Sequence, residues 1–195
     1  MKKLLLVLLS LSSTAALADT IYLGNPSYGG TGCPQGSASA SLSPDNQSLS
    51  ILFDNYVAEA GNSTGRQFDR KSCNVSIPVH VPQGYSVSVF QVDYRGFNGL
   101  PAGGSSQFNV EYFFAGARGP SYSRRFYGAL SSNYTVSNTL VASALIWSAC
   151  GKDVNLRTNS NMLVTTNSNY DEAMATVDSV DIGANLIFHL QWRRC

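Results

Sequence analysis

The sequence predicts an all-β fold, an antiparallel β-sandwich or jelly roll that forms a single domain with two disulfides. Apolar and polar residues alternate with a period of two along most of the chain. Turn-forming residues divide these stretches into roughly eight to eleven short strands. Four cysteines follow an export signal, which is typical of disulfide-bonded secreted domains.

The N-terminus has the pattern of a secretory signal peptide. Lys2 and Lys3 precede an apolar run, and residues 16–18 read Ala-Leu-Ala. We therefore assign residues 1–18 to a cleaved leader and residues 19–195 to one secreted or periplasmic domain. No later segment is long and apolar enough to span a membrane as a helix, so we expect no membrane span.

Residues 37–53 predict a β-hairpin. Small and apolar residues alternate with serine before and after a turn at 44–47, where Pro44 presets φ and Asp45 and Asn46 favour a turn. The apolar positions lie on one face: Ala38, Ala40, Leu42, Leu49, Ile51 and Phe53.

The next stretches also alternate. Residues 75–81 predict a strand in which Pro78 cannot donate a ladder hydrogen bond, so this strand is expected at an edge or to be bulged there. A turn at 82–84 leads to a strand from Tyr85, and residues 90–94 shift the apolar phase, which indicates a bulge. Residues 96–106 predict a glycine-rich loop before a strand at 108–114.

The C-terminal half predicts further short elements. The apolar run 140–149 is interpreted as a strand because no helix cap precedes it and its neighbours are strands. One helical turn is expected within 169–175. The remaining predicted strands are 154–158, 162–166, 175–182 and 186–192.

The cysteines are Cys33, Cys73, Cys150 and Cys195, which allow three pairings. We favour Cys33–Cys73 and Cys150–Cys195, because each bond closes a loop within one half of the chain. A free reactive thiol or a metal site is the alternative, but no C-x-x-C motif is present.

Composition and motifs argue against several function classes. Without Lys2 and Lys3 the chain has 11 basic and 12 acidic residues, so no basic surface for nucleic acid is expected. The glycine-rich stretch 29–36 has no nearby lysine and leads into a strand, which disfavours a phosphate loop. We expect no cofactor and no metal site.

Catalytic motifs are weak. Residues 61–65 match G-x-S-x-G, which would make Ser63 a nucleophile with His80 as base, but no helix is predicted after it. His189 lies in an alternating strand, opposite its apolar neighbours. A two-carboxylate hydrolase would need a pair among Asp54, Asp93 and Glu111, and nothing in the sequence brings two of them together.

Tyrosine is abundant, with ten residues in a chain that has few charges. Exposed tyrosines stack on sugars or contact protein partners, although β-sheets favour half-buried tyrosines for packing alone. The candidate ligand-binding residues, which include one arginine of the basic segment 118–125, are Tyr94, Tyr112, Tyr122, Arg124 and Tyr127.

Four segments of the chain resemble domain-of-unknown-function family 4360, a family of small secreted fungal and bacterial proteins. The segments are GGTGCPQGSASASLSPDNQSLSILFDNY, RKSCNVSIPVHVPQGYSVSV, the SACG at 148–151 and the terminal cysteine. The resemblance implies an exported, cysteine-containing domain of this size and assigns no activity or catalytic residue.

These observations favour a non-catalytic binding or cell-surface module whose partner is a glycan, a protein or another cell-envelope component. The alternatives are an extracellular hydrolase acting on polysaccharide or ester, and a structural coat or matrix protein. Converging catalytic groups in one pocket would favour the hydrolase, and self-association at rising concentration would favour the coat protein.

Overall fold

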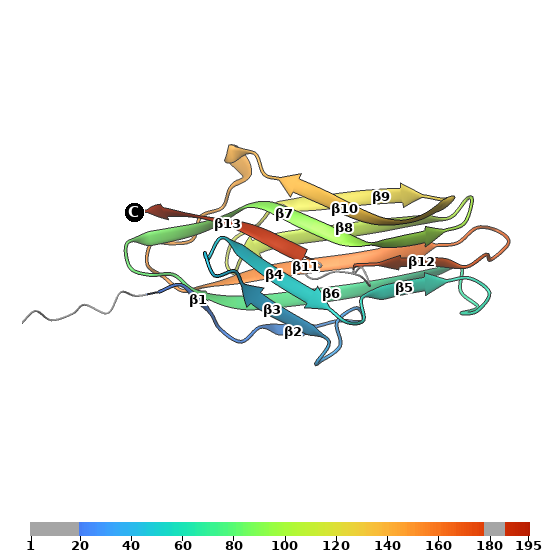
Figure 1. Ribbon diagram of the computed structural model, residues 1–195, viewed down its shortest axis with the longest axis horizontal. Helices are drawn as coiled ribbons and strands as arrows, with labels where there is room; N and C mark the ends of the chain where they lie inside the picture. The colour runs from blue at the N-terminus through green and yellow to red at the C-terminus, as the bar shows by residue number, and fades with distance from the viewer. Residues whose placement is uncertain (1–19, 178–185) are drawn as a thin grey trace, which may run out of the picture.

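Two antiparallel sheets pack face to face in the computed structural model, which describes residues 20–177 and 186–195 (Figure 1). The signal peptide prediction lies outside the described residues. The first sheet has the order β1-β6-β11-β8-β9, with β2 also paired to β6. Its strands are β1 (Tyr22–Leu23), β2 (Ser27–Gly29), β6 (Phe68–His80), β8 (Ser105–Phe114), β9 (Ser121–Tyr127) and β11 (Val154–Thr165).

The second sheet has the order β3-β4-β13-β7-β12-β5, with β10 paired to β7. Its strands are β3 (Ala38–Leu42), β4 (Ser48–Phe53), β5 (Val57–Ala60), β7 (Tyr85–Leu100), β10 (Leu130–Thr139), β12 (Ala173–Thr176) and β13 (Leu186–Arg194). The strands run along the long axis of the molecule, and the C-terminus lies at one end of it (Figure 1). The sandwich predicted from the sequence is confirmed.

The core lies between the two sheets and is rich in aromatic side chains. Tyr94 on β7 packs against Phe108 on β8, with ring centroids 5.2 Å apart. Tyr112 on β8 meets Phe188 on β13 edge to face at 6.2 Å. These contacts come from the apolar positions of the period-two pattern, because alternate residues of a strand point to the same face.

The predicted hairpin is present as β3 and β4, paired from Ala38 with Phe53 to Leu42 with Leu49. Its turn is closed by Asp45, whose Oδ1 accepts a hydrogen bond from the backbone N of Gln47 at 3.1 Å. The side-chain acceptor stabilises the turn, as expected for aspartate at this position.

Pro78 lies in β6 where pairing on one side passes from β1 to β2. Its carbonyl accepts from the backbone N of Gly24 at 2.8 Å, so its imide nitrogen also faces the β1–β2 side. The other side of β6 pairs continuously with β11. The missing N–H therefore leaves the β11 ladder intact.

The predicted bulge lies at Phe90. On β13, His189 pairs with Gln91 but the next residue, Leu190, pairs with Val89, so Phe90 is the extra residue of β7. This bulge accounts for the shift in the apolar phase of the sequence.

Both boundaries of the glycine-rich loop predicted at 96–106 were wrong. Residues 96–100 belong to β7 and residues 105–106 to β8, so the loop is limited to the short turn between these strands. Position 96 of this strand requires glycine, because a Cβ there would lie 2.1 Å from the carbonyl oxygen of Thr176. The glycine permits close approach of two backbones.

Three predictions in the C-terminal half were also wrong. The run 140–149 is no strand: it contains a 3₁₀ turn, η1 (Ala142–Ala144), and then covers the edge of β7, where Ser148 N donates to Val87 O at 2.9 Å. The segments 154–158 and 162–166 are one strand, β11. The helical turn expected within 169–175 is not formed, because a turn at 167–170 leads to β12, and 178–182 of the strand predicted at 175–182 lie outside the described residues.

Both favoured disulfides are present. Cys33–Cys73 joins the segment before β3 to the centre of β6, with Cα atoms 5.4 Å apart. Cys150–Cys195 joins the segment after η1 to the C-terminus, with Cα atoms 6.1 Å apart. The described residues contain no free cysteine.

Candidate functional site

The outer face of the first sheet carries four rows of side chains in register across β6, β11, β8 and β9. Residues directly opposite in antiparallel pairs share a face, so each row crosses all four strands. The first row is Asn74, Asn159, Glu111 and Ser121, and the second is Ser72, Asn161, Asn109 and Ser123. The third is Arg70, Leu163, Gln107 and Arg125, and the fourth is Phe68, Thr165, Ser105 and Tyr127.

This face is hollowed along its length. The central hollow has a volume of about 600 Å³ and is lined by the first two rows and Arg70, together with Val110, Tyr122 and Ser160. A second hollow of about 530 Å³ shares Arg70 and reaches Phe68. A third of about 190 Å³ shares Asn74 and reaches Tyr28 and Arg157. We call these three hollows, which share lining residues, the polar groove.

The second row is held by hydrogen bonds that cross the strands. The Oδ1 of Asn161 accepts from Arg70 Nη2 at 3.3 Å and from Asn109 Nδ2 at 3.1 Å. The Oδ1 of Asn109 in turn accepts from Ser123 Oγ at 2.7 Å and from Gln107 Nε2 at 3.0 Å. Each amide is therefore fixed in one orientation, with its remaining N–H groups free to donate into the groove.

An arginine stands at each end of this network. Arg125 Nη2 donates to Gln107 Oε1, and Arg70 donates to Asn161. In the described part of the chain neither guanidinium forms an ion pair with a carboxylate. Both are exposed, so most of their five N–H donors face solvent.

The first row differs from the second because its side chains have no hydrogen-bond partner among residues 20–177 and 186–195. Asn74 and Ser121 are exposed, whereas Asn159 and Glu111 are partly buried on the floor of the groove. Two amides, a carboxylate and a hydroxyl thus lie side by side across the sheet with their polar atoms unpaired. This row can accept and donate hydrogen bonds to a ligand without breaking internal ones.

Two aromatic side chains stand in the fourth row. Phe68 is 62 % exposed and Tyr127 is 68 % exposed, both far above the core aromatics. They lie at the two sides of the same row, on β6 and β9, and Phe68 lines one end of the polar groove. Exposed aromatic faces of this kind offer flat apolar platforms.

The structure does not bring the five predicted ligand-binding residues together on one surface. Tyr94 and Tyr112 are buried in the core, with 0 % and 2 % exposure, because both point between the sheets. Tyr122 also points inward and stacks on Tyr94 at 5.7 Å. A ligand on the surface cannot reach Tyr94 or Tyr112, so the expectation that they contact one is corrected.

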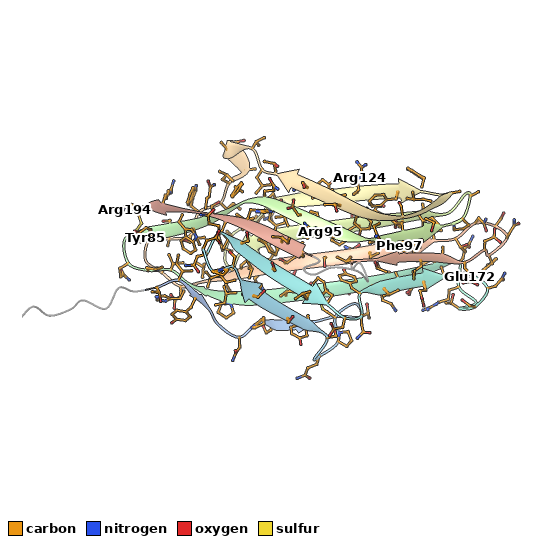
Figure 2. All side chains as sticks on the ribbon, viewed as in Figure 1. Tyr85, Arg95, Phe97, Arg124, Glu172 and Arg194 are labelled. Atoms are coloured by element: carbon orange, nitrogen blue, oxygen red, sulfur yellow. A yellow bond between two sulfur atoms is a disulfide. The ribbon has the colours of Figure 1, made fainter. Side chains whose placement is uncertain are left out.

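The other two predicted residues lie on β9. Arg124 projects from the edge of the sandwich (Figure 2) and lies over the ring of Phe126, 5.7 Å from its centroid. Tyr127 points to the opposite side of β9, onto the face that carries the groove. Of the five, Tyr127 alone therefore has its side chain on the outer face of the first sheet, and Tyr122 alone is among the lining residues of the polar groove.

The groups of the predicted serine hydrolase do not converge. Ser63 donates from Oγ to Glu172 Oε2 at 2.7 Å and from its backbone N to Oε1 at 2.8 Å, and these bonds hold the pKa of that carboxyl below its ordinary value. His80 instead bonds Asp153, with Nδ1 and Oδ1 2.7 Å apart. Ser63 precedes β6 and His80 ends it, so about 40 Å of strand separates them.

The three carboxylates considered for a two-acid mechanism are also apart. Glu111 lies on the outer face of the first sheet, whereas Asp93 lies on the outer face of the second. Asp93 Oδ2 bonds His189 Nε2 at 2.7 Å. Asp54 follows β4 and is exposed. Among the described lining residues of the groove, Glu111 is the single carboxylate.

A metal site is not formed by the described residues, which contain no group of three or more histidine, cysteine, aspartate or glutamate side chains suited to an ion. Within the same residues, no helix has the length and apolar character needed to cross a membrane.

Comparison with known proteins gives the family. The model described as "Domain of unknown function (DUF4360)" matches residues 19–195. The chain belongs to this family. It is also similar to an "Uncharacterized secreted protein" of Arthroderma benhamiae, with 34 % identity over 178 residues, 91 % of this chain and 73 % of that protein. The DUF4360 assignment confirms the resemblance, and the two disulfides fit an extracellular location.

The polar groove was not predicted from the sequence, although one signal indicated it. Asparagine or arginine occupies every second position of β11 from 155 to 161, while the alternate positions are buried. This pattern marks an outward face that is polar but carries few charges. The pattern does not say which residues of β6, β8 and β9 lie opposite, because those strands are distant in sequence.

Proposed function

We propose that the protein is a non-catalytic module that binds an extracellular polysaccharide in the polar groove. The observation that carries the proposal is the first row, in which Asn74, Asn159, Glu111 and Ser121 present unpaired polar atoms along the floor of a hollow. Sugars expose closely spaced hydroxyls that both donate and accept. Amides, hydroxyls and a carboxylate offer the complementary partners at fixed positions.

The second row supports this proposal through pre-organisation. The hydrogen bonds among Asn161, Asn109 and Ser123 fix the side chains before a ligand arrives. Less rotamer entropy is then lost on binding, which favours affinity at a site made of weak individual contacts.

The exposed aromatic rings supply the apolar part of such a site. The C–H face of a sugar ring packs on a flat aromatic ring, and Phe68 offers one at the end of the groove. Tyr127 offers another on β9 in the same row. A groove open along the strands suits a chain of sugars better than a single small molecule.

The separation of the hydrolase candidates supports binding without cleavage. A two-carboxylate mechanism needs both acids on one scissile bond, and Glu111 stands in the groove without a second one among the described lining residues. The predicted removal of residues 1–18 and the release of the domain to the periplasm or the medium are part of the same proposal.

The proposal is tested by binding of purified residues 19–195 to a panel of neutral and acidic polysaccharides, measured by affinity electrophoresis and calorimetry. The variant N74A/N159A removes two hydrogen-bonding groups from the first row. At about 1 kcal/mol for each neutral hydrogen bond, we expect roughly 30-fold weaker binding. The matched control is N133A/T135A, which changes two exposed polar residues on β10 of the other sheet.

A second pair of variants tests the aromatic contact. F68A is expected to weaken binding by about tenfold, whereas V141A removes a side chain of similar exposure, 67 %, from the segment before η1 and leaves binding unchanged. The absence of binding to every polymer of the panel, or equal losses in the groove variants and the controls, would refute the proposed function.

A further inference from the structure

The outer face of the first sheet carries more positive than negative charge. Arg70 and Arg125 stand in the third row, and Arg157 lines the hollow beside Tyr28, while Glu111 is the one carboxylate among the groove-lining residues described. The chain as a whole has nearly equal numbers of basic and acidic residues, 13 and 12. The excess on this face is therefore a local arrangement and not a property of the composition.

The three arginines stand around the groove and not in one cluster. Arg70 and Arg125 are separated by three strand spacings, about 14 Å between Cα atoms. Leu163 on β11 is the third-row neighbour of Arg70. Arg157 lies six residues away from Leu163 on the same strand, a distance of about 20 Å. A ligand that meets all three must be extended over several sugar units.

Their guanidinium groups are available to an external anion. The hydrogen bonds from Arg70 and Arg125 go to the amide oxygens of Asn161 and Gln107, which hold each side chain in place without neutralising it. Arg157 is exposed and makes no ion pair or side-chain hydrogen bond within the described residues. The planar fork of arginine matches a carboxylate with two parallel hydrogen bonds.

We propose that the polysaccharide bound in the groove is acidic, with carboxylates of uronic acid units at Arg70, Arg125 and Arg157. This inference rests on the proposed function and names its ligand class. The hydroxyls of the same chain meet the first row, and Glu111 lies between the arginine positions, where it accepts from hydroxyls. Glu111 also repels a nearby carboxylate, so it lowers the affinity for an acidic chain.

The experiment compares two forms of one polymer. Polygalacturonate carries a carboxylate on every unit, and its fully methyl-esterified form has the same backbone without the charges. We expect the wild-type protein to bind polygalacturonate at least tenfold more tightly than the ester, with an affinity that falls as salt is added because the charges are exposed. Dextran and dextran sulfate serve as neutral and sulfated comparisons.

Two variants act in opposite directions. R70Q/R125Q/R157Q is expected to weaken polygalacturonate binding by about 100-fold or more, since up to three charge-assisted pairs are lost. E111Q keeps the size and one acceptor of the side chain but removes its charge, so it is expected to strengthen polygalacturonate binding by about threefold. The control R194Q changes an exposed arginine at one end of the molecule (Figure 2), on β13 of the second sheet, which is not among the residues that line the groove.

The outcomes separate this inference from the proposed function. Equal binding of the acid and the methyl ester would overturn the acidic ligand while the polysaccharide-binding function stands. Binding of dextran sulfate alone would overturn the assignment to carboxylates. Weaker polygalacturonate binding by E111Q would also contradict it, and binding of no polymer at all would refute the function itself.

Discussion

Removal of one disulfide at a time should destabilise the protein unequally, although both bonds close loops of similar length. The two sequence separations are 40 and 45 residues. The chain-entropy model gives about 4 kcal/mol for each loop, with a difference near 0.1 kcal/mol. Loop closure alone therefore predicts equal losses of unfolding free energy in C33A/C73A and C150A/C195A.

The two disulfides differ in how deeply their cysteines are buried. Cys33 and Cys73 are both 0 % exposed and belong to the core, whereas Cys150 and Cys195 are exposed. Replacing the buried pair with alanine leaves a cavity where two sulfur atoms were, at a further cost of about 1–2 kcal/mol. We expect C33A/C73A to lose about 5–6 kcal/mol and C150A/C195A about 4 kcal/mol.

Urea unfolding at constant pH measures both losses. With an m-value of about 2 kcal/mol/M, the midpoint of C33A/C73A should lie roughly 0.5–1 M below that of C150A/C195A. The wild-type protein in a reducing buffer should behave like a variant that lacks both bonds. Equal midpoints for the two double variants, or a lower midpoint for C150A/C195A, would refute the argument from burial.

Three other properties follow from the same structure. Burial raises the pKa of Tyr112 to about 12, whereas a tyrosine in the unfolded chain ionises near pH 10. The contribution of neutral Tyr112 to the unfolding free energy is therefore full below pH 10 and is lost between pH 10 and 12. An unfolding free energy that stays constant over this pH range would contradict this. Burial works to raise the pKa of Asp93, but hydrogen bonds from Ser137, His189 and Gln91 and the charge of His189 hold it below its ordinary value. The ionised carboxylate therefore contributes stability that is present above pH 4 and lost as the pH falls through its folded pKa. In D93N, acid unfolding followed by circular dichroism should show an unfolding free energy that depends less on pH. G96A should cost about 1–3 kcal/mol in urea unfolding, because its Cβ would lie 2.1 Å from Thr176 O, and an unchanged midpoint would show that the two strands separate freely.

Local pattern accounts for what could be predicted of the fold. The hairpin at 37–53 follows from strict alternation around a proline-containing turn, and the bulge at Phe90 follows from the break in apolar phase. Both signals lie within a few residues of the structure they specify. The disulfide pairing was also correct, because each bond joins cysteines from the same half of the chain.

Tertiary contacts decided the segments that were wrong. The run 140–149 is apolar because it packs over the edge of β7, where Trp147 forms a bridge with Ser88, and not because it is a strand. Gly96 indicated a loop, yet it lies in β7, where glycine is needed because the backbone of Thr176 approaches closely. Composition alone cannot separate a flexible glycine from one required by packing.

The groove was beyond sequence reasoning for a related reason. Asn74, Glu111, Ser121 and Asn159 lie on four strands, and only the register of those strands brings them into one row. Alternation tells which residues point outward but not which ones are opposite. Tyr94 and Tyr112 were predicted to contact a ligand because tyrosine is abundant, but they lie in a sandwich core whose space is filled by large aromatic rings.

The most direct test of the central claim is an NMR titration of the ¹⁵N-labelled domain with oligogalacturonate. If the groove binds the polysaccharide, the amide resonances of β6, β8 and β11 around Asn74, Glu111 and Asn159 should shift in a saturable manner, and those of β10 around Asn133 should not. Shifts confined to β10 and the second sheet, or no saturable shift at any residue, would contradict the account.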